Sequence, residues 1–351
     1  MKYYTGLDVS MKTTSICIIN QDKSIFYEET VPTDPVAISN AIKSTGLKVE
    51  KIAIESGSIS HWLIQELRKR DLPVVCIDSR KMSTVLSIKI NKTDKNDARL
   101  IAEALSCGYY SEVQQKSQED VETRILINSR RTLKDISTKL KNTIRGHLKA
   151  FGILLGAVKS KKFIALVEAH LKDKTDIVQY GLRQLLETFS NIHQKLAEIE
   201  RKLEELAKED EDIKLLKTIP GVGLLTAFSF KIYLGNPNRF RSSRSVGAYF
   251  GMTPTQYSSG ETQKQGRVSK RGASEVRFLL NEAASVMLYR TRTWCRPKAW
   301  GLKIKKKKGH KKATMALGRK LCTIMHRMLI TRKEFEYGEP REKDQVMKKA
   351  G

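Results

Sequence analysis

A run of apolar residues with 3-4 spacing near the middle of the chain restricts most strongly how the chain can fold. The run keeps this spacing over more than three heptads, at Leu182, Leu185, Phe189, Ile192, Leu196, Ile199, Leu203 and Leu206. This period predicts a long helix with one apolar stripe. A similar stripe lies upstream, at Leu126, Leu133, Ile136, Leu140, Ile144 and Phe151. Two long helices joined by a polar connection around 155–175 would form either an antiparallel hairpin or a dimerisation stalk, and the period alone does not choose between them.

The residues before this region alternate between strand-like and helix-like patterns. The expected elements are strands at 3–8, 15–20 and 25–31, a helix at 35–42, a strand at 51–55, a helix at 58–70, a strand at 73–77 and a helix at 94–105. Pro35 suits the first turn of the first helix, and Thr93 can cap the last one. Three strands in series followed by alternating helix and strand predict an α/β domain with a mixed sheet of the ribonuclease H type.

Charge sets the class of partner. The chain has 351 residues, and 65 Lys and Arg against 38 Asp and Glu give it a formal net charge of +27. Such an excess predicts a polyanionic partner, most simply nucleic acid. No apolar run reaches the roughly 18–20 residues that span a bilayer, which argues against a membrane partner. The first residues lack the apolar segment of a signal peptide, and the five cysteines form no C-x-x-C pair. We therefore expect a cytoplasmic protein with reduced thiols.

The same patterns predict the domain organisation. We expect a sheet domain at 1–110, a helical coiled-coil region at 111–210, a mainly helical domain at 211–335 and a tail at 336–351. The third domain is strongly basic: from 262 to 333 only Glu275 and Glu282 are acidic, against 21 Lys and Arg. A helix at 274–290 and a lysine run at 303–312 are most simply phosphate contacts. Trp294 and Trp300 could stack on bases, although core packing is the more ordinary role.

Four acidic residues in the first domain predict a metal site. Asp8 and Glu55 each end an apolar strand, and strand ends can project side chains from neighbouring strands to one point. Asp94 and Asp97 are three residues apart, so one helix face presents both carboxylates. Hard oxygen ligands of this kind hold Mg²⁺ or Mn²⁺, and two such ions can assist phosphoryl transfer. The ordinary alternative for Asp94 and Asp97 is that they are first-turn acids favoured by the helix dipole.

A Pro-Gly-Val-Gly turn at 220–223 lies between two apolar helical stretches. A helix-hairpin-helix turn of this form offers backbone N–H groups at a helix N-terminus to a phosphate. Gly221 and Gly223 are therefore candidates for nucleic-acid binding without sequence readout. The alternative is a tight turn with a purely structural role.

A serine pair precedes Gly260 in what the sequence predicts to be a polar loop. A serine nucleophile needs its proton removed and its phosphate target neutralised. Basic residues that could neutralise a phosphate follow closely, at Lys264, Arg267, Lys270, Arg271 and Arg277. Taken alone, Ser258 and Ser259 are more simply a Ser-Gly turn.

Together these residues resemble a known family. The matching segments are GLDVS at 6–10, KTDKNDA at 92–98, TIPGVG at 218–223, RF at 239–240, GMTP at 251–254 with SG at 259–260, and SKRG at 269–272. In this order and spacing they resemble the DEDD-type insertion-sequence transposases of the IS110 group, which are related to the Piv/MooV site-specific DNA invertases. Each segment alone is a weak match, whereas six in order over most of the chain are specific.

The resemblance implies a RuvC-like N-terminal domain, a helical dimerising stalk and a C-terminal transposase domain. It assigns the acidic tetrad to Asp8, Glu55, Asp94 and Asp97, and the nucleophile to Ser259. It further implies a homodimer or tetramer with a composite site, in which the carboxylates and Mg²⁺ of one subunit serve the serine of another. The serine would hold a broken DNA strand as a phosphoserine ester. A noncoding guide RNA encoded beside the gene would pair with target and donor DNA.

Two departures and three alternatives stay open. Glu55 precedes Ser-Gly where the family often has Thr-Gly, and Ser258 adjoins Ser259. A Holliday-junction resolvase would use the four acids with water as the nucleophile and would need no serine. A nucleic-acid-binding protein with a decayed site would need neither the four acids nor the serine. A site-specific invertase would use the same residues as a transposase.

Overall fold

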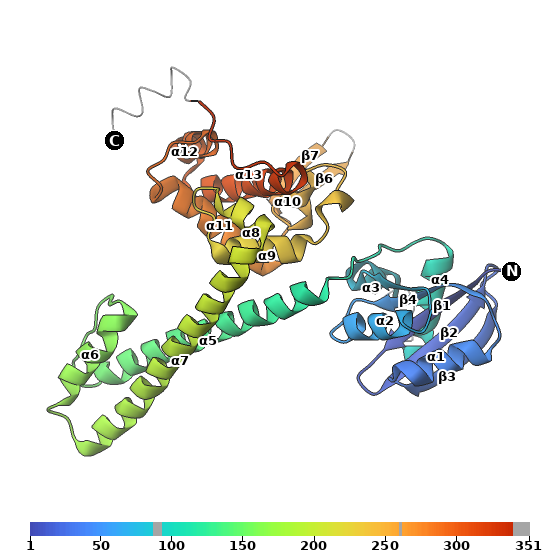
Figure 1. Ribbon diagram of the computed structural model, residues 1–351, viewed down its shortest axis with the longest axis horizontal. Helices are drawn as coiled ribbons and strands as arrows, with labels where there is room; N and C mark the ends of the chain where they lie inside the picture. The colour runs from blue at the N-terminus through green and yellow to red at the C-terminus, as the bar shows by residue number, and fades with distance from the viewer. Residues whose placement is uncertain (87–92, 260–261, 340–351) are drawn as a thin grey trace. The chain divides into compact units, whose positions relative to one another are not determined.

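The computed structural model describes residues 1–86, 93–259 and 262–339. Lys92, Gly260 and most of the expected tail lie outside these residues. The chain divides into two compact units, Met1–Ser117 and Gln118–Gly351 (Figure 1). Each unit is described by itself.

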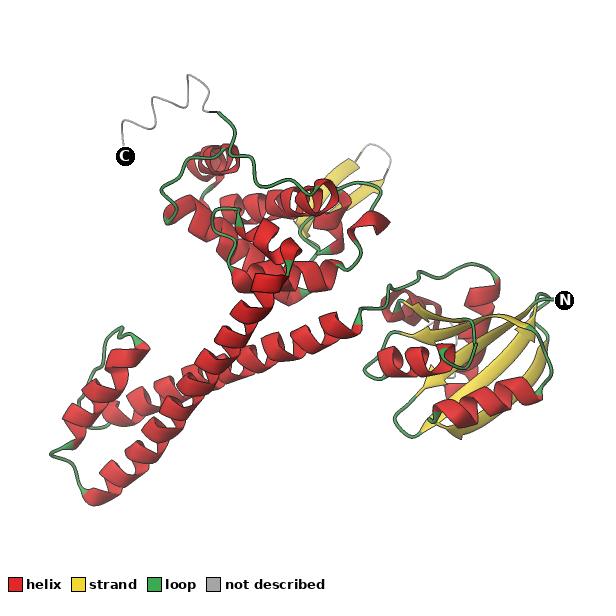
Figure 2. Cartoon of the chain, in the orientation of Figure 1, coloured by secondary structure: helices red, strands yellow, loops and turns green. Residues whose placement is uncertain are grey.

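The first unit contains a five-stranded mixed sheet. Its strands are β1 (Tyr3–Val9), β2 (Thr13–Asn20), β3 (Ile25–Pro32), β4 (Val49–Glu55) and β5 (Val74–Ile77). The strand order is β3-β2-β1-β4-β5. The β1–β2 and β2–β3 pairs are antiparallel, whereas β1–β4 and β4–β5 are parallel (Figure 2). This arrangement confirms the predicted mixed sheet.

Helices cover both faces of the sheet. They are α1 (Pro35–Ser44), α2 (Ser60–Arg68), α3 (Ser79–Leu86) and α4 (Asp94–Ser106). Leu7 and Ile54 point to one face and pack with residues of α1 and α2 such as Ile38 and Leu63. Alternate residues point to the other face, where Ala53 packs with Ile101 of α4. Because neighbouring strand residues face opposite sides, nearly continuous apolar strands are the pattern expected for a sheet covered twice.

The predicted helix starts are confirmed at two capping residues. The Asp34 carboxylate accepts a hydrogen bond of 2.8 Å from the Ala37 amide at the start of α1. The Thr93 hydroxyl accepts one of 3.2 Å from the Asn96 amide at the start of α4. Each bond satisfies an amide that the first helical turn leaves without a backbone partner.

The second unit begins with an antiparallel helical hairpin. Its helices are α5 (Gln118–Lys149), α6 (Ser160–Leu171) and α7 (Asp176–Glu209). Arg130 and Glu200 form an ion pair of 2.6 Å, and the Ser137 hydroxyl lies 3.1 Å from Nε2 of His193. Residue numbers that rise along α5 meet falling numbers along α7, so the two helices pair within one chain (Figure 1). The dimerising role stays a prediction.

Two details of the hairpin differ from the prediction. The connection expected to be polar contains α6, whose Phe163 is buried against Phe189 at a ring-centroid distance of 5.5 Å. Ile136 and Phe151, expected on the packing stripe, are 41% and 45% exposed. The neighbouring Ser137 is buried instead, because its bond to His193 satisfies its hydroxyl between the helices.

The rest of the second unit is mainly helical, as predicted. Its elements are α8 (Glu211–Lys217), α9 (Leu224–Leu234), the short 3-10 helix η1 (Pro237–Arg239), α10 (Ser245–Tyr249), β6 (Pro254–Ser259), β7 (Thr262–Val268), α11 (Ser274–Tyr289), α12 (Arg296–Lys308) and α13 (His310–Thr331). One core joins them, with Phe230, Phe250, Leu280 and Leu317 fully buried. Within the described parts of the chain, no helix is both long and apolar enough to cross a membrane.

Candidate active site

Asp8 and Glu55 lie at the same end of two neighbouring strands. Leu7 of β1 pairs with Ile54 of β4, and the two acids are the next residue on each strand. β1 and β4 run parallel, so the polypeptide leaves both strands at the same edge of the sheet. The two strand ends are about one strand spacing, 4.8 Å, apart. Both acids are half-buried. The predicted convergence of these two strand ends therefore has a direct basis in the register.

Both acids share the sheet face that α4 covers. Gly6 and Ala53 precede them by two residues and face α4, since Gly6 lies against Ala98 and Ala53 packs with Ile101. Residues two apart on a strand point to the same side. The face of the sheet under α4 therefore carries two carboxylates at its edge.

The first turn of α4 supplies the other two acids, which differ in exposure. Asp97 is 5% exposed and lies one turn before Ile101, on the helix face that packs on the sheet. Asp94 is exposed. The three-residue spacing thus gives one acid directed to the sheet side of α4 and one directed to solvent.

The acids fit a divalent cation in chemistry, although they do not form a closed ligand cluster. Carboxylate oxygens are the ligands that Mg²⁺ and Mn²⁺ take in proteins. Among the residues that the structure describes, no three His, Cys, Asp or Glu side chains lie close enough together to hold a metal ion. Metal binding by the tetrad of Asp8, Glu55, Asp94 and Asp97 stays a prediction.

The serine pair lies in a strand, so the prediction of a loop is wrong. Ser258 pairs with Gln263 and Ser259 with Thr262 across the β6–β7 hairpin. The sequence did not reveal this hairpin because its strands are polar and lack the alternation of a half-buried sheet. Ser259 therefore has a defined backbone position at the end of a strand.

Two glycines anchor the base of this hairpin. The segment after β7 crosses the segment before β6, where the Ser269 amide donates to the Thr253 carbonyl at 2.9 Å. A Cβ on Gly251 would lie 2.5 Å from the backbone nitrogen of Arg271, and one on Gly272 would collide with the Tyr249 carbonyl. Both glycines also have positive φ. The GMTP and SKRG segments are thus joined in space, a relationship that their glycines signal and that we did not predict.

The basic residues around the hairpin fall into two groups. Arg267, Lys270 and Arg271 are exposed. Lys264 lies in β7, opposite Tyr257. Arg277 is half-buried, and its Nη1 donates to the carbonyls of Phe250 at 3.2 Å and Gly272 at 2.9 Å. Arg277 thus holds the hairpin base, whereas the exposed residues are available to a phosphate.

The glycines of the 220–223 turn have different surroundings. Gly221 has a φ of +89°, and a Cβ there would lie 2.6 Å from the Ala283 carbonyl of α11. Position 221 therefore requires glycine, because α11 approaches it closely. Gly223 is exposed at the start of α9, and a Cβ there would meet nothing within 4 Å. Phosphate binding at this turn stays a prediction, and Gly223 is the better placed of the two.

Comparisons with known proteins match both groups of residues. A DEDD transposase model of the IS110 type matches residues 5–153, which include the four acids. A second model, described as the transposase IS116/IS110/IS902 family, matches residues 213–299, which include the serine hairpin and its anchors. The chain belongs to the IS116/IS110/IS902 family of transposases. It is therefore an enzyme that cleaves and joins DNA, which gives its positive charge a polyanionic substrate.

Individual relatives agree with this family. The transposase for insertion sequence element IS1111A of Coxiella burnetii is 29% identical over 338 residues, covering 95% of this chain and 91% of the relative. The transposase for insertion sequence element IS1328 of Yersinia enterocolitica is 29% identical over 244 residues, covering 68% and 71%. A pilin gene-inverting protein of Moraxella lacunata is 23% identical over 355 residues, covering 95% and 98%.

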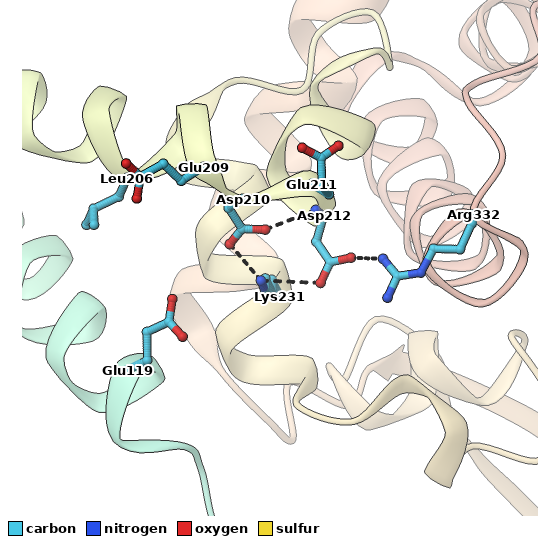
Figure 3. A pocket seen from close by; sticks show the side chains of 8 residues that line it. All are labelled: Glu119, Leu206, Glu209, Asp210, Glu211, Asp212, Lys231 and Arg332. Atoms are coloured by element: carbon cyan, nitrogen blue, oxygen red, sulfur yellow. Dashed lines mark hydrogen bonds and ion pairs between the residues drawn. The ribbon is translucent and has the colours of Figure 1, made fainter.

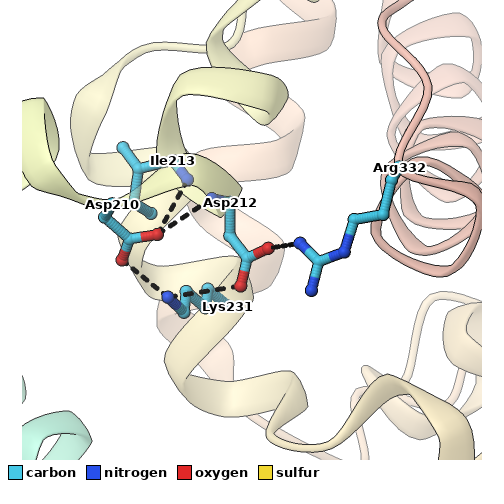
Figure 4. A network of polar contacts seen from close by, with 5 residues as sticks. All are labelled: Asp210, Asp212, Ile213, Lys231 and Arg332. Carbon is cyan, nitrogen blue, oxygen red and sulfur yellow. Dashed lines mark hydrogen bonds and ion pairs between the residues drawn. The ribbon is translucent and has the colours of Figure 1, made fainter.

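The second unit of the transposase also contains an acidic hollow, whose charged side chains form ion pairs that join helices. It has a volume of about 480 Å³ and is lined by Glu119, Leu206, Glu209, Asp210, Glu211, Asp212, Lys231 and Arg332 (Figure 3). Lys231 lies 2.6 Å from Asp210 and 3.2 Å from Asp212, and Arg332 pairs with Asp212 (Figure 4). Two cations thus neutralise the aspartates that face them. The network ties α9 and the end of α13 to the start of α8.

Proposed function

We propose that this transposase cuts and rejoins DNA through a phosphoserine intermediate, with Ser259 as the nucleophile. The Ser259 oxygen would bond to a DNA phosphorus while the bond from that phosphorus to one deoxyribose oxygen breaks. The serine proton would end on the leaving oxygen. In the second step a hydroxyl of the new strand would attack the same phosphorus, and the serine oxygen would recover a proton.

The acidic tetrad would support this reaction from the first unit. Asp8, Glu55, Asp94 and Asp97 would hold Mg²⁺ or Mn²⁺, which supplies charge neutralisation to the phosphoryl oxygens. The single observation that carries the proposal is the Leu7–Ile54 register, which puts Asp8 and Glu55 at one sheet edge under α4. The strand order β3-β2-β1-β4-β5 with its mixed directions also supports a RuvC-like reading of this unit.

The hairpin base would hold the nucleophile in place. A reacting atom gains rate when it is kept near its target in a fixed orientation. The crossing at Gly251 and Gly272 and the two bonds of Arg277 restrain the chain on either side of β6 and β7. Exposed Arg267, Lys270 and Arg271, together with Lys264, would neutralise the DNA backbone nearby.

The wider assembly is part of the same proposal. The acids and the serine belong to different units of the chain, which is compatible with a composite site made from two subunits. A homodimer or tetramer would then be required, with the region 111–210, which contains the α5–α7 hairpin, as the dimerisation region and 211–335 as the transposase domain. A noncoding RNA would read target and donor sequences by base pairing, and the charge of +27 supports such a second polyanionic partner.

Two alternatives differ from this reading in testable ways. A resolvase-like nuclease would use the same four acids with water as the nucleophile, so Ser259 would be dispensable. A site-specific invertase would use Ser259, and the similarity to the pilin gene-inverting protein favours keeping this possibility. The products formed on DNA carrying one or two recombination sites separate the invertase from the transposase.

A denaturation-resistant protein–DNA adduct tests the serine chemistry. The experiment incubates the full chain with element-end DNA, Mg²⁺ and RNA from the element's noncoding flank, followed by denaturing electrophoresis. The expected result is an adduct in the wild type and in Ser258→Ala, and none in Ser259→Ala. Cleavage without an adduct in any of the three proteins would favour metal-activated water. Loss of the adduct in Ser258→Ala alone would move the nucleophile to Ser258.

A further inference from the structure

A groove between α12 and α13 combines an exposed aromatic ring with lysines. It is a hollow of about 290 Å³, lined by Trp300, Lys303, Ile304, Lys307, Lys308, Lys312 and Ala316. This volume is near the lower end of small-molecule pockets, which begin at about 300 Å³. The groove lies in the second unit and shares no lining residue with the acids or the serine hairpin.

Helical spacing explains how these side chains come together. On α12 they recur at positions i, i+3, i+4, i+7 and i+8, counted from Trp300. On α13, Lys312 and Ala316 are one turn apart. Positions with this spacing share one face of a helix, so two facing stripes form the walls. Its apolar lining residues are Trp300, Ile304 and Ala316, and the lysines add apolar stems with charged ends.

Trp300 is not a core residue. It is 38% exposed, so a large aromatic surface remains open to solvent. The Nζ atom of Lys320 lies 4.6 Å from its ring centroid, a cation–π contact that helps to hold the ring in position. An exposed ring that is already held in place loses little conformational freedom when a flat ligand stacks on it.

The groove carries charge of one sign. Its described lining contains no acidic side chain. The sequence has no Asp or Glu between Glu282 and Glu334, a stretch that includes all of α12 and α13. Its complement is therefore an anion with a flat apolar part, which is the composition of a nucleotide.

We propose that this groove binds an unpaired nucleotide of a DNA strand. The base stacks on Trp300, and Lys303, Lys307, Lys308 and Lys312 contact the flanking phosphates. Stacking on aromatic side chains between basic residues is how proteins hold single strands without reading sequence. A duplex hides the faces of its bases, so the ring favours an unpaired strand. The proposal builds on the proposed function only in taking DNA as the substrate, and a strand opened at the cut supplies the ligand.

The test measures binding of a fluorescent dT15 oligonucleotide to the full chain by anisotropy. All proteins carry Ser259→Ala and the buffer contains EDTA, so the result does not depend on serine chemistry or metal. Trp300→Ala is expected to weaken binding about tenfold, within the range of about 1–3 kcal/mol for loss of one base stack. Trp300→Phe keeps a stacking ring and is expected to retain most of the affinity. Trp62→Ala is the matched control, since Trp62 of α2 is 47% exposed in the other unit.

A second variant avoids dependence on the folding of the tryptophan mutant. Lys303→Gln with Lys307→Gln changes two exposed lysines and is expected to reduce the slope of log affinity against log salt by about 1.4, or about 0.7 for each phosphate contact. Equal affinity of Trp300→Ala and wild type for dT15, with an unchanged slope in the lysine variant, would overturn the proposal.

Other occupants would give different results. If Trp300→Ala weakened binding of rU15 alone, the groove would belong to RNA and the DNA assignment would fail. If it changed the sedimentation of the protein with no effect on dT15, the groove would be an interface between copies. If Trp300→Ala lost equal affinity for dT15 and for a 15-bp duplex, the groove would bind DNA through general charge and not through base stacking. None of these outcomes affects the adduct test of Ser259.

Discussion

Gly6 of β1 and Ala98 of α4 lie closer together than any side chain at position 6 would allow. A Cβ on Gly6 would collide with the Ala98 carbonyl oxygen and lie 2.6 Å from the Ala102 amide nitrogen. Both atoms belong to the helix backbone, so the collision could be relieved only if the helix moved. Because β1 carries Asp8 and α4 carries Asp97, this contact also sets the distance between two of the candidate catalytic acids.

Gly6→Ala is therefore expected to lower stability and activity together. Insertion of a methyl group into a closely packed contact costs about 1–3 kcal/mol, and here the whole of α4 would have to shift. Urea unfolding measures the free energy, and the adduct assay measures activity. Gly146→Ala is the control, because a Cβ there meets nothing within 4 Å and alanine has a higher helix propensity than glycine in α5. A Gly6→Ala protein as stable and active as wild type would show that the α4 contact is not tight in solution.

Removal of one charge at the acid site is expected to abolish metal-dependent chemistry while the fold persists. Asp8→Asn and Asp97→Asn keep the size of each side chain and remove the negative charge that a cation requires. We expect Mg²⁺-dependent cleavage to fall by about a hundredfold or more, as when a group that stabilises the reacting charges is lost.

The control for this experiment is Glu50→Gln. Glu50 lies in β4, the strand that Glu55 ends, and is exposed, with an ion pair to Lys2 at the surface. Its loss is expected to change nothing measurable. Full cleavage by Asp97→Asn with normal Mg²⁺ dependence would reduce Asp97 to a buried structural acid.

The sequence was sufficient for the five strands and for α1, α2 and α4 of the first unit because each has a local signal, whereas α3 (Ser79–Leu86) was not predicted. Apolar and β-rich runs predicted the strands, and Pro35 and Thr93 predicted two helix starts. The sheet edge that holds Asp8 and Glu55 followed from the position of each acid at a strand end. What the sequence could not supply was the different exposure of Asp94 and Asp97, which depends on how α4 rotates against the sheet.

The second unit was harder to predict because its signals depend on distant partners. The short helix α6 depends on burial of Phe163 against α7, although the four-residue spacing of Phe163, Val167 and Leu171 is a local signal that the prediction of a polar connection missed. Ser137 occupies the packing side of α5 only because His193 satisfies it from the other helix. The β6–β7 hairpin has a polar sequence, so no alternation of apolar and polar residues marks it. In each case a contact between residues far apart in the chain decides the structure.

Lys231 is expected to contribute stability through its two aspartates. Although burial alone would lower the pKa of Lys231, contacts with Asp210 and Asp212 raise it above its usual value. Lys231→Met would leave Asp210 and Asp212 facing each other at side-chain exposures of 15% and 21%. We expect a loss of about 2 kcal/mol in the free energy of unfolding, less than the about 3–5 kcal/mol of a fully buried pair.

The pH dependence of this contribution has a defined sign. A raised folded pKa means that the stabilisation is fully present below the usual value of 10.5 and is lost as the pH rises through the folded value. The difference in unfolding free energy between wild type and Lys231→Met should therefore be constant at neutral pH and shrink above pH 10.5. A difference that grew with pH would contradict the ion-pair assignment.

One thiol is expected to react much faster than the other four. Cys107 is exposed, whereas Cys17, Cys76, Cys295 and Cys322 are buried. Burial raises the pKa of Cys17 and Cys322 to about 12, which keeps both as unreactive thiols at neutral pH. Titration of the native protein with a maleimide at pH 7 should give one rapid equivalent, and Cys107→Ser should remove it. A rapid second equivalent would mean that a core that holds one of the four buried cysteines opens readily.

Arg277 and Arg271 are expected to act differently although both were predicted to bind nucleic acid. Arg277 donates to the Phe250 and Gly272 carbonyls at the hairpin base, so Arg277→Met should leave two part-buried acceptors short of a donor. We expect a loss of about 1–3 kcal/mol in stability and a weaker Ser259 adduct, with little change in the salt slope of duplex DNA binding. Arg271 is exposed, so Arg271→Met should keep the stability and reduce that slope by about 0.9.

Urea unfolding and binding titrations across a salt series measure both effects on the same proteins. The comparison separates positioning from phosphate contact, because only a residue that displaces a counterion changes the slope. If Arg277→Met reduced the slope and left stability unchanged, its guanidinium would turn toward DNA when the complex forms. The hairpin base would then depend on the backbone crossing at Gly251 and Gly272, and Gly251→Ala would be the variant that uncouples DNA binding from formation of the Ser259 adduct.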